Sequence, residues 1–333
     1  MPAPPARLDG IGADAVLFLT GIHDARQLAR FDPARWPGIR RRIAIDLIGD
    51  IDRLGDPALR AALFERIVDV RGAFKRTYPD RFAEFDALLM ARWRAAAAGD
   101  RPVRVLDAGV SDGSTSLPLI EAVDRMSGGQ FFFTATDLDG CYVRLSRGRA
   151  PERRVILSAS GAIVQIVVPP FLFTRRESRY LFPVNRMLRP AADRFAGRLI
   201  ADWRIGSADV DVSEILLLAP AMRQRVGEDK RVTFRAWDIL EPWPGETADC
   251  VRAMNVLNPG YFDDGQMKRV VANLFAAVKD GGWLAMGSNE DAGSPVDGIV
   301  CRRAGQRLEL VVTSGRGFRA HDALTGLMVT GRT

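Results

Sequence analysis

Residues 103–116 read VRVLDAGVSDGSTS. A short apolar strand ends at Asp107, a turn that contains Gly109 and Gly113 follows, and a helix can begin near Ser114, whose side chain is a good cap for free backbone amides. Glycine lets the backbone of such a turn pass close to a ligand, because no side chain stands in the way. The stretch therefore predicts a strand, a binding turn and a helix.

The sequence on the C-terminal side of this unit predicts an α/β fold. Short apolar strands alternate with helices, which is the order that produces a parallel sheet with helices on both faces. Residues 298–303 and 307–313 then form a predicted hairpin, so we expect a Rossmann-like, mostly parallel seven-stranded sheet. The predicted strands are 104–108, 131–137, 232–238, 250–254 and 283–287, and the predicted helices are 115–126, 212–227 and 264–279.

Two segments lie outside that plan. Within residues 1–100, apolar side chains such as Leu63 and Ile67 recur at spacings of three and four, which is typical of amphipathic helices. We predict an N-terminal helical subdomain over residues 1–100 and a ligand-binding domain over residues 101–333. Between its second and third strands this fold needs one helix and two short loops, so residues 141–230 are predicted to be an insertion.

Composition restricts the class of protein. The 333 residues are 47% hydrophobic and carry a formal net charge of +6, which is too small an excess to indicate nucleic acid as a partner without a recognition motif. The 3 cysteines show no paired spacing, so the sequence predicts neither a disulfide framework nor a metal site. The longest apolar run, 163–173, is far shorter than the roughly 20 residues that span a bilayer. With no signal-peptide pattern at residue 1, we expect a cytoplasmic protein.

Polar side chains also follow the other predicted strands. Asp137 ends the second strand, Asp238 the third and Asn255 the fourth. A carboxylate at the end of the second strand can accept hydrogen bonds from both hydroxyls of a ribose, and nearby Asp139 is the competing candidate for this role. A helix cap is the alternative role for such an aspartate. Because parallel strands end at the same edge of a sheet, we expect these side chains to share one site.

Together and in this order, the motifs resemble the S-adenosylmethionine-dependent class I methyltransferase superfamily over about residues 101–318, without the insertion. The resemblance implies S-adenosylmethionine as cofactor, with the first turn at its amino-acid end, the second strand at its ribose and the third at its adenine. The turn lacks the Gly-x-Gly-x-x-Gly run that holds a pyrophosphate, which disfavours a nicotinamide cofactor. On this basis the cofactor-binding residues are Asp107, Gly109, Ser111, Gly113, Asp137, Leu138, Asp238, Ile239 and Asn255.

Residues 249–291 also resemble the chemotaxis receptor glutamate methyltransferases. These carry an Arg-x-x-Asn-Val-Leu segment like the one at Arg252 and Asn255, and a Gly-Gly pair like that at 281–282. The first turn differs, and Asn-Pro-Gly at 258–260 interrupts the segment that follows. This likeness therefore informs the fold and not the substrate.

Methyl transfer from a sulfonium depends mainly on aligning the nucleophile with the methyl group, so a dedicated base is optional. The catalytic candidates are Asn255 and Tyr261 after the fourth strand, and His23 in the N-terminal region. The insertion, aromatic and arginine-rich over 171–182, is expected to form a substrate pocket, a peripheral membrane contact or a homo-oligomer interface. We expect transfer to an oxygen or nitrogen of a small-molecule or lipid-like acceptor; a protein glutamate methyltransferase and a non-catalytic cofactor-binding scaffold are the alternatives.

Overall fold

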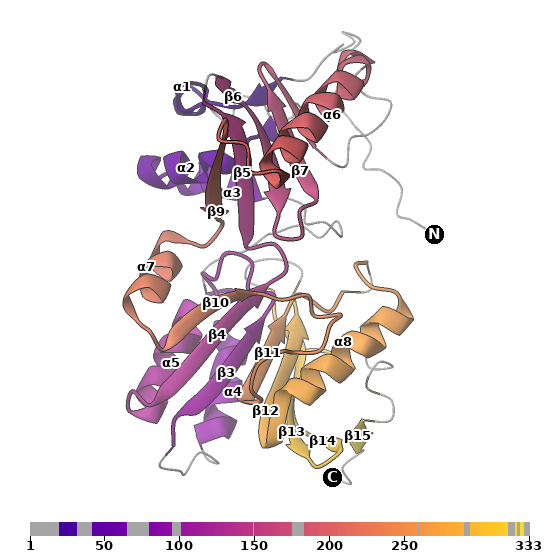
Figure 1. Cartoon of the computed structure of the whole chain (residues 1–333). Coiled ribbons are helices and arrows are strands. Elements are labelled where there is room, and N and C mark those ends of the chain that lie inside the picture. The colour runs from indigo at the N-terminus through magenta and orange to yellow at the C-terminus, as the bar shows by residue number, and fades with distance from the viewer. Residues whose placement is uncertain are drawn as a thin grey trace, which may run out of the picture. The chain divides into compact units, whose positions relative to one another are not determined.

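The computed structural model of the chain divides into two compact units (Figure 1). Unit 1 combines Met1–Val70 with Cys141–Leu216, and unit 2 combines Arg71–Gly140 with Leu217–Thr333. The structure describes residues 20–31, 42–64, 80–94, 101–148, 150–174, 183–258, 260–289, 294–318, 324 and 327–329.

Unit 2 contains a mixed sheet. Its strands are β3 (Val103–Ala108), β4 (Phe131–Asp137), β10 (Val232–Ala236), β11 (Ala248–Met254), β12 (Val278–Ser288), β13 (Asp297–Ala304), β14 (Arg307–Ser314) and β15 (Met328–Val329). They lie in the order β10-β4-β3-β11-β12-β13-β14-β15. The first five are parallel, β13 pairs antiparallel with both its neighbours, and the two-residue β15 extends the edge. This confirms the Rossmann-like, mostly parallel sheet, with β15 added to the seven longer strands.

Helices cover both faces of this sheet, as predicted. The helices α4 (Ala83–Arg94), α5 (Leu117–Ser127) and α7 (Pro220–Glu228) share a core with one face, and α8 (Asp264–Ala277) shares a core with the other. Alternation along the strands separates the two cores, because successive side chains point to opposite faces. Phe131 and Phe133 of β4 therefore pack in the first core, whereas Leu106 of β3 packs in the second.

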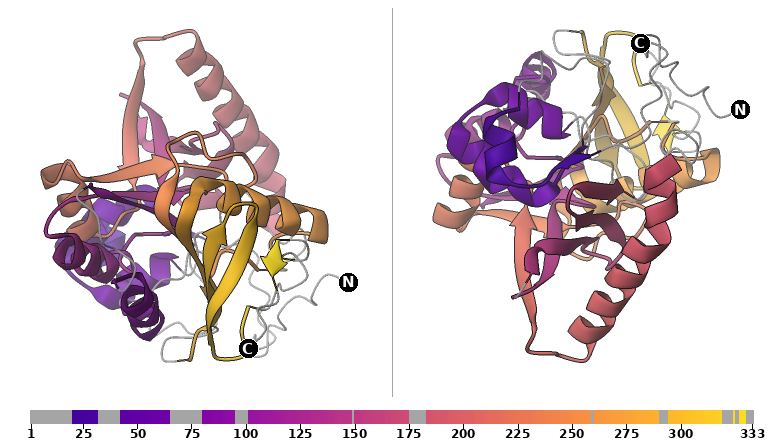
Figure 2. Two further views of the ribbon diagram at one scale, coloured as in Figure 1. Left: turned by 90° about the horizontal axis from the view of Figure 1, so that it is seen from below. Right: turned by 90° about the horizontal axis from the view of Figure 1, so that it is seen from above.

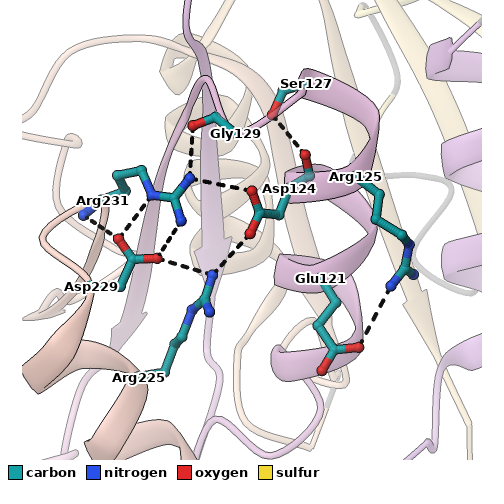
Figure 3. A network of polar contacts seen from close by, with 8 residues as sticks. All are labelled: Glu121, Asp124, Arg125, Ser127, Gly129, Arg225, Asp229 and Arg231. Atoms are coloured by element: carbon teal, nitrogen blue, oxygen red, sulfur yellow. Dashed lines mark hydrogen bonds and ion pairs between the residues drawn. The ribbon is translucent and has the colours of Figure 1, made fainter.

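An arginine–aspartate network joins α5, α7 and β10 at the amino end of the sheet (Figure 3). Arg231 donates hydrogen bonds to Asp229, to Asp124 and to the carbonyl of Gly129, and Arg225 contacts the same two carboxylates. The hydrogen bond from Arg231 is the main cause that lowers the pKa of Asp229. The network connects the two crossover helices at the end of the sheet opposite to the strand carboxyl ends.

Unit 1 is built mainly from the predicted insertion. Its strands are β5 (Cys141–Arg147), β6 (Ala150–Ser158), β7 (Ile163–Val168), β8 (Phe171–Thr174) and β9 (Val210–Leu216), in the antiparallel order β8-β7-β6-β5-β9. The helix α6 (Pro183–Arg204) packs on this sheet through Ala192, Ala196 and Leu199. The N-terminal elements are β1 (Gly21–Ile22), α1 (Ala25–Ala29), β2 (Arg42–Ile43), the 3-10 helix η2 (Ile45–Leu47), α2 (Ile48–Leu54) and α3 (Pro57–Phe64).

Long-range polar contacts join the N-terminal residues to the insertion. Arg154 on β6 makes an ion pair with Asp46, and the Gln165 side chain accepts from the backbone of Ile45 at 2.9 Å and donates to Ile43 at 3.1 Å. All of these groups are buried or nearly so, which makes an unpaired partner costly. The described N-terminal residues, 20–31 and 42–64, therefore form one compact unit with residues 141–216.

The units differ from the predicted division at two boundaries. We predicted a helical subdomain over 1–100, but α4 belongs to unit 2, where Phe85 and Trp93 pack in its core. We predicted that the insertion extends to residue 230, but its C-terminal part is the crossover helix α7. The predicted helix 212–227 was wrong before Pro220, because residues 212–216 belong to the strand β9. Residues 65–79 and the arginine-rich segment 175–182 lie outside the described residues.

Among the described helices, none combines the length and apolar character that crossing a bilayer requires.

Candidate functional site

The parallel sheet of unit 2 reverses its direction of growth at β3. From β3 the chain adds β4 and β10 on one side, and later adds β11 and β12 on the other. Ligands of open parallel sheets bind in the crevice outside the carboxyl ends at such a switch point. The turn at 109–116 and Asn255 follow the two strands that meet there. The topology alone therefore places the candidate site at this edge.

The turn after β3 has an uncommon backbone conformation. Gly109 and Gly113 both have φ of 74°, and Ser111 has φ of 57°. A Cβ atom at Gly113 would lie 2.6 Å from Cγ of Met222, and one at Gly109 would lie 2.4 Å from Cγ2 of Val256. The two glycines are therefore required by backbone geometry and by neighbouring side chains of the protein itself, before any ligand is considered.

Asp137, at the end of β4, reaches back to this turn. Its carboxylate accepts hydrogen bonds from the backbone N–H of Ser111 at 2.7 Å and from that of Asp139 at 3.0 Å. Backbone N–H groups of Gly109 and Val110 also donate to the carbonyl of residue 136, at 2.8 and 3.0 Å. A carboxylate oxygen can accept more than one hydrogen bond, so these backbone donors do not exclude a ligand. One side chain thus links two of the strand ends that were predicted to share a site.

Asp107 is buried beneath the turn, in an ion triad that we name the Arg252 triad: Asp107, Arg252 and Asp86. The Asp107 carboxylate accepts from Nε and Nη2 of Arg252, at 2.9 and 2.7 Å, and from Oγ of Ser116 at 2.7 Å. Arg252 also donates from Nη1 to Asp86 on α4 at 2.5 Å and from Nη2 to the carbonyl of Thr115 at 3.2 Å. Asp107 and Arg252 are each only 1% exposed. This geometry favours a role for Asp107 in shaping the turn, instead of the predicted contact with a ligand.

The Arg252 triad carries one positive and two negative charges when all its groups are ionised. Burial opposes the charge on Arg252, but Asp107 and Asp86 outweigh that effect and raise the pKa of the guanidinium. Burial raises the pKa of Asp86 to about 6, although Arg252 acts against the rise. Oδ1 of Asp86 is also buried and has no hydrogen-bond partner among the described residues. Asp86 is therefore the weakly satisfied member of the triad.

Asn255 follows β11 with φ of 56° and pairs with Asn289, which follows β12. The Asn255 side-chain amide donates to Oδ1 of Asn289 at 3.0 Å, and the backbone N–H of Asn289 donates to Oδ1 of Asn255 at 2.8 Å. Arg81 donates to Oδ1 and to the carbonyl of Asn289, at 2.6 and 3.1 Å. The orientation of Asn255 is thus set by two strand ends and by a residue that precedes α4.

Two predicted adenine contacts differ in position. Asp238 is partly buried, and its carboxylate accepts from the backbone N–H of Leu240 at 2.9 Å, which stabilises the turn after β10. Ile239 is 6% exposed and packs in the core beneath α8, so its side chain does not face the edge as predicted. The sequence did not show that Ile239 joins this core.

The remaining candidates lie in different environments. Leu138 is partly buried directly after β4, and Tyr261 is partly buried and packs against the α8 core. His23 belongs to unit 1, where its ring lies 3.7 Å from Asp24 and 3.1 Å from Nε2 of Gln27. Burial lowers the pKa of His23. The structure therefore collects the turn, Asp137, Asp238 and Asn255 at one edge of unit 2, while His23 belongs to the other unit.

A cavity of about 500 Å³ lies on the face of the unit 2 sheet and away from this edge. The connection between β10 and β11 contains no helix, and the loop around Trp243 lines the cavity. The residues that line the cavity include Arg104, Phe132, Thr134, Arg235 and Trp243.

In the part of the chain that the structure describes, no cluster of histidine, cysteine and acidic side chains could hold a metal ion.

Sequence reasoning missed the groups that support the site. Asp86, Ser116, Arg81 and Asn289 were not predicted, and Arg252 was noted only through a family resemblance. One signal was present: Arg252 is a charged residue in a strand whose other side chains are mostly apolar, and a buried charge requires a partner.

Comparison with known proteins identifies no family. No family model matches the sequence, and no curated protein does. Among solved structures, the N-methyltransferase NodS from Bradyrhizobium japonicum with S-adenosyl-L-homocysteine matches 74% of this chain and 74% of its own, at 13% identity and a TM-score of 0.31. The CMeT domain of citrinin polyketide synthase matches 72% of this chain and 41% of its own, at 13% identity and a TM-score of 0.33. An O-methyltransferase family protein from Burkholderia thailandensis matches 71% of this chain and 43% of its own, at 15% identity and a TM-score of 0.30. The chain spans less than half the length of the last two, and at these scores the likeness assigns no activity.

Proposed function

We propose that this chain binds S-adenosylmethionine at the carboxyl ends of β3, β4, β10 and β11 and transfers its methyl group to an acceptor. The observation that carries the proposal is the hydrogen bond between Asp137 and the glycine turn at the switch point of the sheet. It joins a carboxylate suited to ribose hydroxyls to a turn without the glycine run of pyrophosphate sites. S-adenosylmethionine presents a ribose and an adenine but no phosphate.

The donors and acceptors at this edge fit such a cofactor. Asp137 offers acceptors for ribose hydroxyls, and Asp238 offers an acceptor for the exocyclic amine of adenine. Asp107 is buried beneath the turn and does not take part in this set. It accepts from Ser116, and its partner Arg252 donates to the carbonyl of Thr115, so together they hold the start of α5 and the shape of the turn. When bound, the cofactor supplies an electrophilic methyl group on a sulfonium. The protein then has to align the acceptor with that methyl group.

Asn255 and Tyr261 are the proposed groups on the acceptor side. The pair with Asn289 fixes the Asn255 amide, which leaves it able to orient an acceptor oxygen or nitrogen without moving itself. The proposed acceptor is a small or lipid-like molecule that presents such an atom. The Arg-x-x-Asn segment gives no support to a protein glutamate substrate, because Arg252 is buried in the triad and does not present its charge at the surface.

Removal of the Asp137 charge tests the proposal. Asp137→Asn keeps the size of the side chain, and we expect it to weaken binding of S-adenosylhomocysteine in equilibrium dialysis by at least about tenfold, which corresponds to roughly 1.4 kcal/mol for lost charge-assisted hydrogen bonds. The matched control is Asp280→Asn, at the amino end of β12, which should bind as the unchanged protein does. Equal affinity of both variants, with circular dichroism showing both folded, would remove the ribose assignment.

A further inference from the structure

The outward side of α6 presents one continuous stripe of exposed residues. We name this the outer stripe: Met187, Ala191, Arg194, Arg198, Ala201 and, just after the helix, Ile205. Spacings of four and three alternate along it, so these side chains lie above one another on one side of a helix. The opposite side carries Ala192, Ala196 and Leu199, which pack on the sheet of unit 1. Figure 2 shows the whole length of α6 along the outside of the unit 1 strands.

The chemistry of the outer stripe is unusual for a helix face in water. Met187 is 79% exposed and Ile205 is 81% exposed, about 27 Å apart along the helix axis. The two arginines lie between them, and the stripe contains no acidic and no uncharged polar side chain. Solvent-facing helices ordinarily mix charges of both signs.

Acidic residues near the stripe are already engaged. Asp193 is held by Arg189 of the same helix at 2.8 Å, and Asp202 is paired with Arg147 on β5. The stripe is therefore cationic at its centre and apolar at both ends.

We propose that the outer stripe rests on an anionic lipid surface. Exposed apolar side chains can enter the headgroup boundary of a bilayer, and the guanidinium groups between them can contact lipid phosphates. A second copy of the chain fits poorly, since twofold pairing would place the arginines of one stripe against those of the other. Nucleic acid would explain the arginines but not the exposed Met187 and Ile205.

Vesicle sedimentation tests this proposal with the full chain. The unchanged protein should sediment with phosphatidylglycerol-containing vesicles and not with pure phosphatidylcholine vesicles, and its binding should fall as salt is added. Arg194→Glu with Arg198→Glu should lower the partition coefficient at least about tenfold, because each arginine near such a surface contributes a factor of about five. The control is Arg92→Glu with Arg94→Glu, exposed positions on α4 with the same change in net charge, which should bind almost as the unchanged protein does.

The apolar ends make a separate contribution. Met187→Gln with Ile205→Gln should reduce the binding that persists at high salt, because salt screens the arginines and leaves the apolar contact. No sedimentation with anionic vesicles at low salt would overturn the proposal. An equal loss of vesicle binding in both arginine double variants would also overturn it, because net charge alone would then explain the binding. So would a protein that does not bind vesicles but self-associates, if the glutamine double variant abolishes that self-association. Neither proposed methyl transfer nor cofactor binding enters this test.

Discussion

Arg252 lies on β11, a strand whose seven residues are all buried. Its guanidinium group, which has five N–H donors, donates to two carboxylates and a backbone carbonyl. Removing it leaves Asp107 and Asp86 buried without a cation. We therefore expect Arg252→Met to lower the free energy of unfolding by about 3–5 kcal/mol in urea denaturation. Arg92→Met, at an exposed position on α4, should change it by less than about 0.5 kcal/mol. An Arg252→Met protein as stable as the original would show that the triad contributes no net stability.

Asp86 gives the triad a dependence on pH. Burial raises its pKa from 3.8 to about 6, so the folded protein holds this proton more tightly than the unfolded chain does. The contribution of Asp86 to stability is therefore full below its unfolded pKa and is lost as the pH rises through about 6. Asp86→Asn cannot titrate. The stability of this variant relative to the unchanged protein should increase between about pH 4.5 and about pH 7.5. A relative stability that stays constant or decreases over this range would contradict the role given to burial.

The turn between β3 and α5 is set by its neighbours at the scale of the element. Gly113 needs both a left-handed backbone and the space beside Met222, whereas Gly128, which ends α5 with φ of 58°, has no atom within 4 Å of an added Cβ. Gly128→Ala should therefore cost about 1–2 kcal/mol for the backbone alone. Gly113→Ala should lower the free energy of unfolding by more than that, as measured by urea denaturation. The double variant Gly113→Ala with Met222→Ala should lose less stability than the sum of the losses in the two single variants, because the second change removes the clash. Strict additivity would contradict the contact.

Elements with a strong local pattern could be predicted from the sequence. The strands that build the sheet around β3 were identified because each is a short apolar run ended by a polar turn. The helix predicted over 264–279 matches α8, which begins after the capping residue Asp263. The failure at β9 has a local cause. Four consecutive residues of this edge strand are exposed, so it lacks the alternation of a half-buried strand. Pro220, which opens α7, marked the true start of the helix.

The division of the whole molecule was harder to predict than its elements. Unit 1 depends on Arg154 bonding to Asp46 and on Gln165 bonding to Ile45, pairs that are 108 and 120 residues apart in sequence. The burial of Asp107 depends on Arg252, 145 residues away. A motif shows that a carboxylate follows a strand, but only the folded chain shows whether that carboxylate faces a ligand or a buried arginine. The meeting of these strand ends at one edge of the sheet was therefore predictable, and the hydrogen-bond partners of their carboxylates were not.

The most direct test of the proposed function is calorimetric titration of the full chain with S-adenosylmethionine and S-adenosylhomocysteine, with NAD as control. We expect saturable binding of the first two with dissociation constants on the order of micromolar, which correspond to a binding free energy of about −8 kcal/mol, and no heat from NAD. Binding of NAD, or the absence of binding by all three to a protein shown to be folded by circular dichroism, would contradict it.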